Sequence, residues 1–287
     1  MLYYEKIPNP NSSEWVLFIH GLGGSMKTWK YQTEKFSRDY NIIMVDLDGH
    51  GKSSNKKLRS RYKPTSTVRA IRKILLHEKI EKVHIVSLSL GTLIAMEFAR
   101  LYPDMVESLV LGGGILNLTI SRQFILKIAE FATKHFPTGL SYKSFAHIIM
   151  PGKNHEKSRE IFIREAKKLN GNMFNKWVSS IGLANKRLRA SIKSIKKKHI
   201  PILMISGKED YMFLNGIKKI GRKVKNFNVT LLRNCGHVVS IEKADLFNNL
   251  TLRFLKQNRK YIPLPPVSRT DIHNSFDDTD HIPVKAE

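Results

Sequence analysis

The sequence predicts an α/β protein in which a mostly parallel central sheet carries helices on both faces. Short β-branched runs alternate with longer segments of helical periodicity, which is the pattern of such folds. Most strand candidates are apolar throughout, as strands covered on both faces must be. At 287 residues with 41% hydrophobic side chains, the chain is long enough for one enlarged domain with a sizeable core.

Six segments have the character of strands, and two of the segments between them have the character of helices. The predicted strands cover residues 15–19, 41–46, 82–87, 108–112, 201–206 and 228–232. Residues 64–79 repeat apolar side chains at helical spacing, and residues 90–101 have the composition of an apolar helix. Helices between parallel strands predict right-handed crossovers.

The alternation is interrupted between residues 115 and 199, where amphipathic helical patterns follow one another without a strand. We expect residues 115–199 to form an inserted helical cap, or lid, over a core made of residues 1–114 and 200–260. Residues 261–287 show no periodicity and are rich in proline and acidic residues, which predicts a disordered tail.

Ser89 lies where a predicted strand turns into a predicted helix. Strand 82–87 runs into the letters S-L-S-L-G, which approximate the G-x-S-x-G pattern of a nucleophile elbow. At such a turn the serine hydroxyl stands clear of the sheet, and small neighbours let strand and helix approach closely. Ser87 replaces the first glycine of the pattern, whereas Gly91 keeps the last. The alternative is a serine that caps the N-terminus of a buried helix.

Two glycine-rich turns follow other predicted strands. Residues 20–29 (HGLGGSMKTW) come after strand 15–19, and residues 47–53 (LDGHGKS) come after strand 41–46. The unpaired backbone N–H groups of such a turn, where a helix begins, can face an anion. Both turns are expected at the carboxyl edge of the sheet, where ligands bind in open α/β sheets.

Taken together, these motifs resemble the α/β-hydrolase family over residues 14–256. The resemblance implies an α/β-hydrolase fold and a nucleophilic Ser89, with the backbone N–H groups of Leu22 and Leu90 forming an oxyanion hole. It also implies the chain order serine, acid, histidine, so that the acid and the base follow Ser89 in the sequence.

Two downstream loops carry the expected acid and base. Strand 201–206 is followed by G-K-E-D, which places Asp210 on the next loop, and strand 228–232 is followed by R-N-C-G-H, which ends in His237. A carboxylate on one loop can orient an imidazole on its neighbour, and the imidazole can accept the serine proton. Glu209 is a competing acid, but the family pattern favours the fourth position of G-x-x-D and hence Asp210.

Other reactive side chains near these motifs are expected to serve the structure. His20 and His50 lie in glycine-rich turns, where we expect hydrogen-bonded architectural roles. Cys235 is expected to be a small buried residue. A single cysteine excludes an internal disulfide and, with no secretory signal pattern at the N-terminus, predicts a cytoplasmic protein.

The resemblance implies a serine hydrolase that cleaves a carboxylic ester, thioester or lactone through an acyl-enzyme. A serine at the elbow excludes the epoxide hydrolases and haloalkane dehalogenases of the family, which use aspartate there. Two alternatives stay open: a relative that acts on carbon–carbon bonds, like the enzyme that forms a cyclohexadiene carboxylate in menaquinone synthesis, and a ligand-binding receptor with little turnover. No cofactor is expected, because the triad needs only water, and no Cys/His cluster suggests a metal.

The cap is expected to set specificity for a small-molecule acyl substrate. Its aromatic side chains could accept an acyl chain or a ring, and Phe124, Phe131 and Trp177 are the candidates for substrate contact. Packing within the cap explains these aromatic side chains equally well.

The chain is strongly basic, with 49 Lys and Arg against 24 Asp and Glu. Residues 115–199 hold 18 of the cations and 4 of the acids, and residues 186–198 alone hold seven cations. A basic cap at an active-site mouth predicts attraction of an anionic substrate, an acidic carrier protein that bears the acyl group, or an anionic membrane surface. A solvated lysine-rich surface is the alternative. Nucleic acid is not expected, because no helix-turn-helix, zinc finger or aromatic-interleaved basic sheet accompanies the charge.

Overall fold

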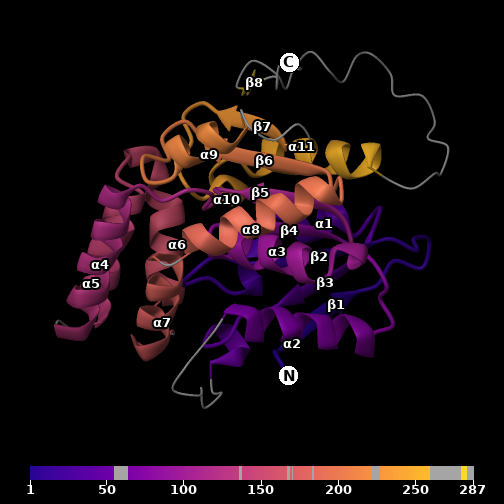
Figure 1. Cartoon of the computed structure of the whole chain (residues 1–287), viewed down its shortest axis with the longest axis horizontal. Helices are drawn as coiled ribbons and strands as arrows, with labels where there is room; N and C mark the ends of the chain where they lie inside the picture. The colour runs from indigo at the N-terminus through magenta and orange to yellow at the C-terminus, as the bar shows by residue number, and fades with distance from the viewer. Residues whose placement is uncertain are drawn as a thin grey trace.

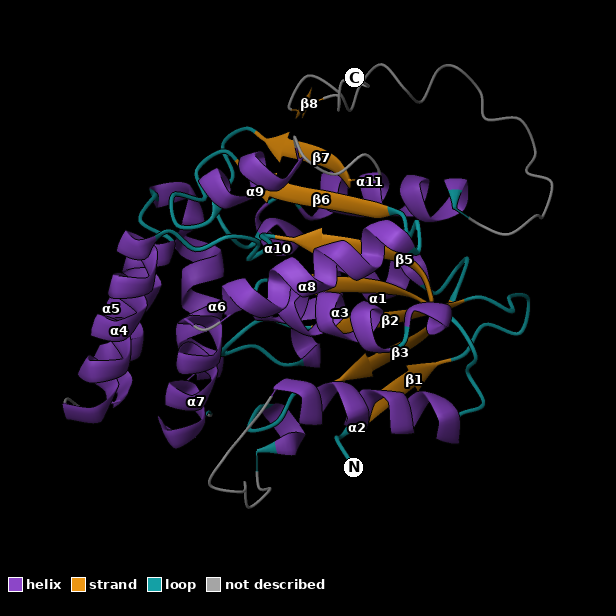
Figure 2. Cartoon of the chain, in the orientation of Figure 1, coloured by secondary structure: helices purple, strands orange, loops and turns teal. Residues whose placement is uncertain are grey.

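The computed structural model describes residues 1–54, 64–135, 138–166, 169, 171–182, 184–221, 227–258 and 279–282. Its centre is a sheet with the strand order β1-β3-β2-β4-β5-β6-β7-β8 (Figure 2). Neighbouring strands from β3 to β7 pair in parallel, whereas β1 and β8 pair antiparallel at the two edges. The strands are β1 Tyr4–Ile7, β2 Trp15–Ile19, β3 Asn41–Val45, β4 Val83–Leu88, β5 Val106–Gly112, β6 Ile202–Gly207, β7 Phe227–Leu232 and β8 Thr279–Ile282.

The six predicted strands are confirmed, and none of their ends differs from the prediction by more than two residues. Strands β3, β4 and β6 are buried at every position, which explains their uninterrupted apolar runs. The sheet is thus the mostly parallel, doubly covered sheet that the sequence predicts.

Both edge strands lack this apolar signal, and the sequence did not predict them. Strand β1 has the sequence YEKI and only partial burial, because one of its edges and part of its faces contact solvent. Strand β8 pairs with β7, so the expectation of disorder is wrong for Thr279–Ile282. An edge strand is held by backbone hydrogen bonds to its one neighbour, for which composition gives little sign. The rest of the predicted tail lies outside the described residues.

Two groups of helices cover the sheet. Helices α2, α3 and α8 pack against one another on the face toward the viewer in Figure 1, and α1 and α11 pack together on the other face. Helix α2 buries Val68, Ile71, Ile74 and Leu75, the apolar positions that predicted it. The core helices are α1 Lys30–Phe36, α2 Pro64–His77, α3 Leu90–Leu101, α9 Leu214–Gly221, α10 Val239–Glu242 and α11 Ala244–Gln257. Short 3₁₀ turns cover Met26–Trp29, Gly51–Ser53, Pro103–Met105 and Lys153–His155.

Between β5 and β6 the described residues form helices and the loops that join them, with no strand, as predicted. The helices of this segment are α4 Ile120–His135, α5 Thr138–Ile149, α6 Glu156–Ala166, α7 Gly171–Gly182 and α8 Ala184–Lys197. Helices α4 to α7 project beyond the end of the sheet (Figure 1), and we call these four helices the cap.

The predicted end of the cap at residue 199 is too late. Helix α8 lies along α3 on the sheet and buries Leu188, Ser191 and Ile195. It therefore belongs with the core, although its sequence is amphipathic like that of the cap helices. Since α8 carries most of the basic run 186–198, that charge lies on the core and not on the cap. None of the helices in the described ranges combines the length and hydrophobicity needed to cross a bilayer.

Candidate active site

Ser89 occupies a strained turn between β4 and α3. Its backbone has φ 51° and ψ −117°, which a residue with a side chain adopts only when the surroundings impose it. The Ser89 N–H donates to the carbonyl of Gly112 at 2.9 Å. A Cβ atom at Gly91 would lie 2.3 Å from the carbonyl oxygen of Ile19, so the close approach of α3 to β2 requires glycine there.

Ser87, which replaces the first glycine of the elbow pattern, does not share the position of Ser89. It is fully buried at the end of β4, and its hydroxyl donates to the carbonyl of Val110 on β5 at 3.1 Å. The second hydroxyl is therefore bound within the sheet, while Ser89 lines a pocket.

A chain of hydrogen bonds joins the three predicted triad residues. His237 Nε2 lies 2.7 Å from Ser89 Oγ, and His237 Nδ1 lies 2.9 Å from Asp210 Oδ2. Asp210 is fully buried, and its Oδ1 accepts the backbone N–H of Phe213 at 3.2 Å. With Nδ1–H donating to the carboxylate, Nε2 is left to accept the serine proton. The structure thus brings Ser89 together with two residues that lie more than a hundred positions further along the sequence.

The acid loop and the base loop are fastened to each other. The N–H of Glu209 donates to the carbonyl of Cys235 at 2.9 Å, and the N–H of Lys208 donates to that of Leu232 at 2.8 Å. A Cβ atom at Gly207 would lie 2.0 Å from the Cys235 oxygen, so the contact depends on glycine. Cys235 is buried, as predicted, and burial raises the pKa of its thiol.

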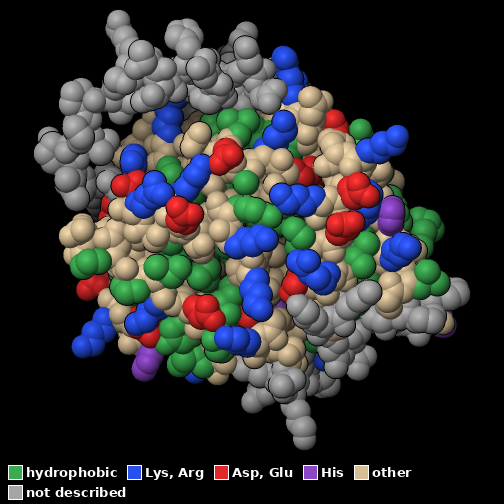
Figure 3. All heavy atoms as spheres, turned by 180° about the vertical axis from the view of Figure 1, so that it is seen from behind, with side chains coloured by type: hydrophobic (Ala, Val, Ile, Leu, Met, Phe, Trp, Pro, Cys, Tyr) green, Lys and Arg blue, Asp and Glu red, His purple; other side chains and the backbone are tan. Residues whose placement is uncertain are grey.

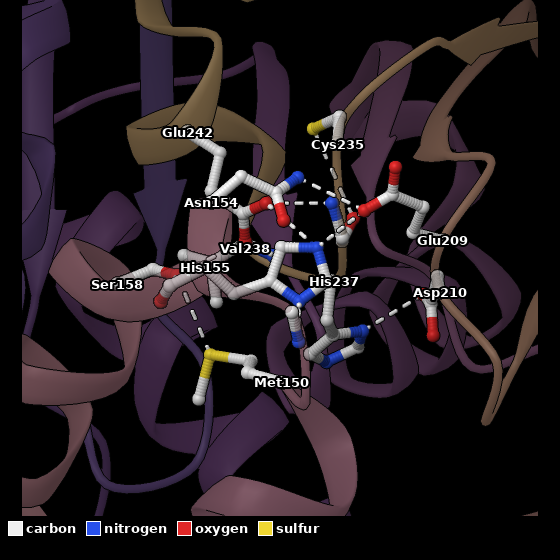
Figure 4. A network of polar contacts seen from close by, with 12 residues as sticks. Met150, Asn154, His155, Ser158, Glu209, Asp210, Cys235, His237, Val238 and Glu242 are labelled. Carbon is white, nitrogen blue, oxygen red and sulfur yellow. Dashed lines mark hydrogen bonds and ion pairs between the residues drawn. The ribbon is translucent and has the colours of Figure 1, made fainter.

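Glu209, the competing acid, contacts a histidine of the cap instead of His237. Figure 4 shows Glu209 and Asp210 directed to different partners. Glu209 Oε2 accepts from His155 Nε2 and from Asn154 Nδ2, each at 2.9 Å. His155 is fully buried and sits in the turn before α6. The contact therefore ties the cap to the acid loop.

Glu242 fixes the backbone on both sides of His237. Its Oε2 accepts the N–H of Gly236 at 2.6 Å and its Oε1 accepts the N–H of Val238 at 3.0 Å (Figure 4). The hydroxyl of Ser158 on α6 also donates to Glu242, at 3.0 Å. Sequence reasoning did not single out Glu242 or His155. Glu242 could have been found from the sequence, because it follows His237 by only five residues. His155 could not, because nothing in the sequence indicates that it contacts Glu209.

We predict that Glu242→Gln lowers kcat by about 10–100-fold with little change in KM, because an amide replaces the carboxylate that holds two N–H groups and His237 then drifts from its hydrogen-bonding position. Steady-state kinetics on a chromogenic ester, with circular dichroism to verify folding, measures the effect. Asp245→Asn removes an exposed carboxylate from the next helix and is the matched control. A folded Glu242→Gln protein with wild-type kcat would contradict the assigned role.

The loop after β2 lies next to Ser89. Leu22 lines the same pocket as Ser89, and the N–H of Gly23 donates to His50 Nε2 at 3.1 Å. Asp46 accepts the N–H of Met26 at 2.8 Å, which anchors the start of the following 3₁₀ turn. Leu90 is the first residue of α3, where backbone N–H groups have no acceptor within the helix.

His20 and His50 have the architectural roles that the sequence predicts. His20 Nε2 accepts the N–H of Leu47 at 3.0 Å, and the two rings lie 5.0 Å apart, edge to face. Burial lowers the pKa of both imidazoles, and for His50 the proximity of His20 lowers the pKa further. Both rings are therefore neutral and shape the loops around Leu22.

A pocket opens above Ser89 between the core and the cap. Together with the open solvent at its mouth, it holds about 700 Å³ of empty space. Its cap side is apolar, with Leu126, Phe145, Ile149, Ile161, Phe162 and Ile181. Apart from His237, Glu165 is the one ionisable side chain among the described lining residues. The Glu165 carboxylate accepts from the hydroxyl of Ser25 at 3.4 Å.

The three predicted substrate contacts lie elsewhere. Phe124 and Phe131 are 63% and 59% exposed on the outer side of α4, whose inner side places Leu126 in the pocket. Trp177 is fully buried, and its Nε1–H donates to the carbonyl of Asp48 at 3.1 Å. The prediction is wrong for all three positions, because a list of aromatic residues does not say which face of a cap helix turns inward.

Part of the chain matches a known protein family, and most of the chain is similar to a curated bacterial protein. Residues 14–131 match the family described as alpha/beta hydrolase fold. A putative 2-succinyl-6-hydroxy-2,4-cyclohexadiene-1-carboxylate synthase of Bacillus subtilis is 25% identical over 252 residues, covering 86% of this chain and 92% of that protein.

Solved structures agree with this match. MGS-M2, an α/β hydrolase enzyme from a Medee basin deep-sea metagenome library, is similar with a TM-score of 0.77 at 23% identity, covering 92% of this chain and 97% of that one. A carboxylesterase structure from Nitrososphaera gargenis gives a TM-score of 0.76 at 18% identity, covering 89% and 94%. The chain therefore has the α/β-hydrolase fold, and residues 14–131 match the family of that description.

Proposed function

We propose that this protein is a serine hydrolase that cleaves carboxylic esters, and by the same chemistry thioesters or lactones, through an acyl-enzyme. The observation that carries the proposal is the hydrogen-bonded chain from Ser89 through His237 to buried Asp210, at the floor of an apolar pocket. The likeness to an esterase structure supports hydrolysis as the reaction class.

In this mechanism Ser89 Oγ attacks the acyl carbonyl carbon while His237 Nε2 takes the hydroxyl proton. Asp210 holds the imidazole in the required tautomer and stabilises its positive charge. His237 then gives the proton to the departing alcohol or thiol, which leaves the acyl group on Ser89. A water molecule then attacks the acyl carbon and loses a proton to His237. His237 passes this proton to Ser89 Oγ as the bond between Oγ and the acyl carbon breaks, which releases the acid and restores the serine.

The N–H groups of Leu22 and Leu90 are the proposed oxyanion hole. Leu90 follows the nucleophile at the start of α3, and Leu22 lines the same pocket as Ser89. Two preorganised donors stabilise the negative charge that develops on the carbonyl oxygen, and loss of one costs on the order of 3 kcal/mol in the barrier.

The pocket favours a neutral, apolar acyl group. The strongly basic composition led us to expect an anionic substrate, but no Lys or Arg is among the described lining residues. An anionic acyl group would lose its hydration on entering this apolar pocket, which costs free energy. It would also be repelled by the carboxylate of Glu165.

We predict that kcat/KM rises about fourfold per methylene along a series of p-nitrophenyl esters from acetate to longer acyl chains, until the pocket is filled. A p-nitrophenyl ester of succinate is expected to be poorer than the butyrate ester by on the order of 100-fold. Glu165→Gln should reduce the ratio of kcat/KM between the butyrate and succinate esters, since it removes the carboxylate that repels the succinate. Absence of turnover at every chain length, with a folded protein, would refute the proposed reaction.

A carbon–carbon bond reaction is the second candidate, because the relative from Bacillus subtilis is named as a putative cyclohexadiene-carboxylate synthase. The product in that name carries a succinyl group and a carboxylate. The described lining offers these anions no cationic partner, so we favour the ester. Formation of the named product by this protein, without ester turnover, would reverse the preference.

A further inference from the structure

One side of α4 presents large apolar side chains to solvent. Phe124, Ile128 and Phe131 follow one another at intervals of four and three residues, and they are 63%, 52% and 59% exposed. This spacing places them on one helix face. Leu126 turns the other way and lines the pocket.

The neighbouring helix α5 has the same two-sided character. Leu140 and Ile148 are 58% and 51% exposed, whereas Phe145 and Ile149 line the pocket. Of the eight large hydrophobic side chains that are exposed in the described residues, five lie on these two helices. A helix that is apolar on both sides is normally covered on both sides.

Cations accompany this apolar surface. Among the described side chains of α4 and α5, Lys127 and Lys143 are exposed, whereas the guanidinium of Arg122 donates to the carbonyl of Tyr211 at 2.7 Å. The surrounding segment 115–183 holds 11 Lys and Arg against 4 acids. Figure 3 shows hydrophobic side chains at the right-hand rim of the molecule, the end where the cap lies in that view, with Lys and Arg side chains beside them.

We propose that α4 and α5 dock the cap onto an anionic lipid bilayer. The exposed apolar side chains enter the boundary between head groups and acyl chains, and the flanking cations pair with lipid phosphates. A second copy of the chain is a poorer occupant, because two like-charged faces would meet in a symmetric dimer. The same two helices line the pocket from their inner sides, so docking would bring the pocket close to the lipid.

Co-sedimentation of the full chain with vesicles tests the proposal. We expect the protein to pellet with vesicles of phosphatidylcholine mixed with phosphatidylglycerol, to remain largely in solution with phosphatidylcholine alone, and to be released as salt is added. The combined variant Phe124→Ser, Ile128→Ser, Phe131→Ser should lower the partition coefficient at least about tenfold.

The matched control is Leu76→Ser, which removes a side chain that is 51% exposed on α2, away from the cap. Its partition should equal that of the wild type, and circular dichroism of all variants would show intact folding. Wild-type protein that stays in solution with both lipid mixtures would overturn the proposal, as would equal partition of the triple variant. Because sedimentation needs no turnover, it is independent of the proposed hydrolysis. A concentration-dependent dimer that the triple variant abolishes, without vesicle binding, would assign the face to a second copy.

Discussion

Ser89→Ala is expected to lower kcat for p-nitrophenyl esters by on the order of 10⁶-fold and to abolish covalent labelling by a fluorophosphonate. The hydroxyl removed is the atom that lies 2.7 Å from His237 Nε2 and that would carry the acyl group. Labelling followed by gel fluorescence and intact-mass spectrometry measures the result directly, without a natural substrate.

The matched control is Ser87→Ala. Ser87 lies two residues earlier, but its hydroxyl is bound to the carbonyl of Val110 inside the sheet. This variant should keep fluorophosphonate labelling and most of the activity, with a modest loss of stability of about 1 kcal/mol for the lost hydrogen bond. Labelling that survives in Ser89→Ala and disappears in Ser87→Ala would show that the nucleophile has been misassigned.

Asp210→Asn is expected to lower kcat by about 10⁴-fold while leaving substrate binding largely intact. An amide in place of the carboxylate no longer enforces Nδ1–H on His237, so Nε2 is no longer held ready to accept the serine proton. Since Asp210 is fully buried, water cannot substitute for it. The measurement is kcat and KM on the best ester of the series.

Glu209→Gln provides the comparison within the same loop. Glu209 is adjacent in sequence, but its carboxylate contacts His155 and Asn154 of the cap. We expect less than about a tenfold loss in kcat, because the chain from Asp210 to Ser89 stays in place. A larger loss in Glu209→Gln than in Asp210→Asn would mean that the acid is Glu209.

The basic charge of the chain has a different meaning once residues are placed in space. The run 186–198 lies mainly on α8, which packs on α3 beside the sheet. The cap retains an excess of cations, but the described pocket lining contains none. The charge therefore lies away from the described pocket lining, and the proposed substrate is one that the pocket would hold by apolar contact.

The fold was predictable because its parallel strands must be apolar along their whole length. Strands such as β3 and β6 are short apolar runs that are buried at every position. The edge strands β1 and β8 lack that constraint, and helix α8 has the same amphipathic pattern that it would have in a cap. Composition alone could not separate these cases.

The sequence by itself determined where the six parallel strands lie along the chain and which motifs resemble the family. It also determined the candidates Ser89, Asp210 and His237, because each of these three residues lies in a short motif that follows a strand. Only the tertiary structure decided that Glu209 contacts His155, that Glu242 holds the backbone on both sides of His237, and that Leu126 faces the pocket in place of Phe124. These contacts join side chains from segments far apart in the chain, and their geometry depends on how helices rotate and pack, which local patterns do not encode.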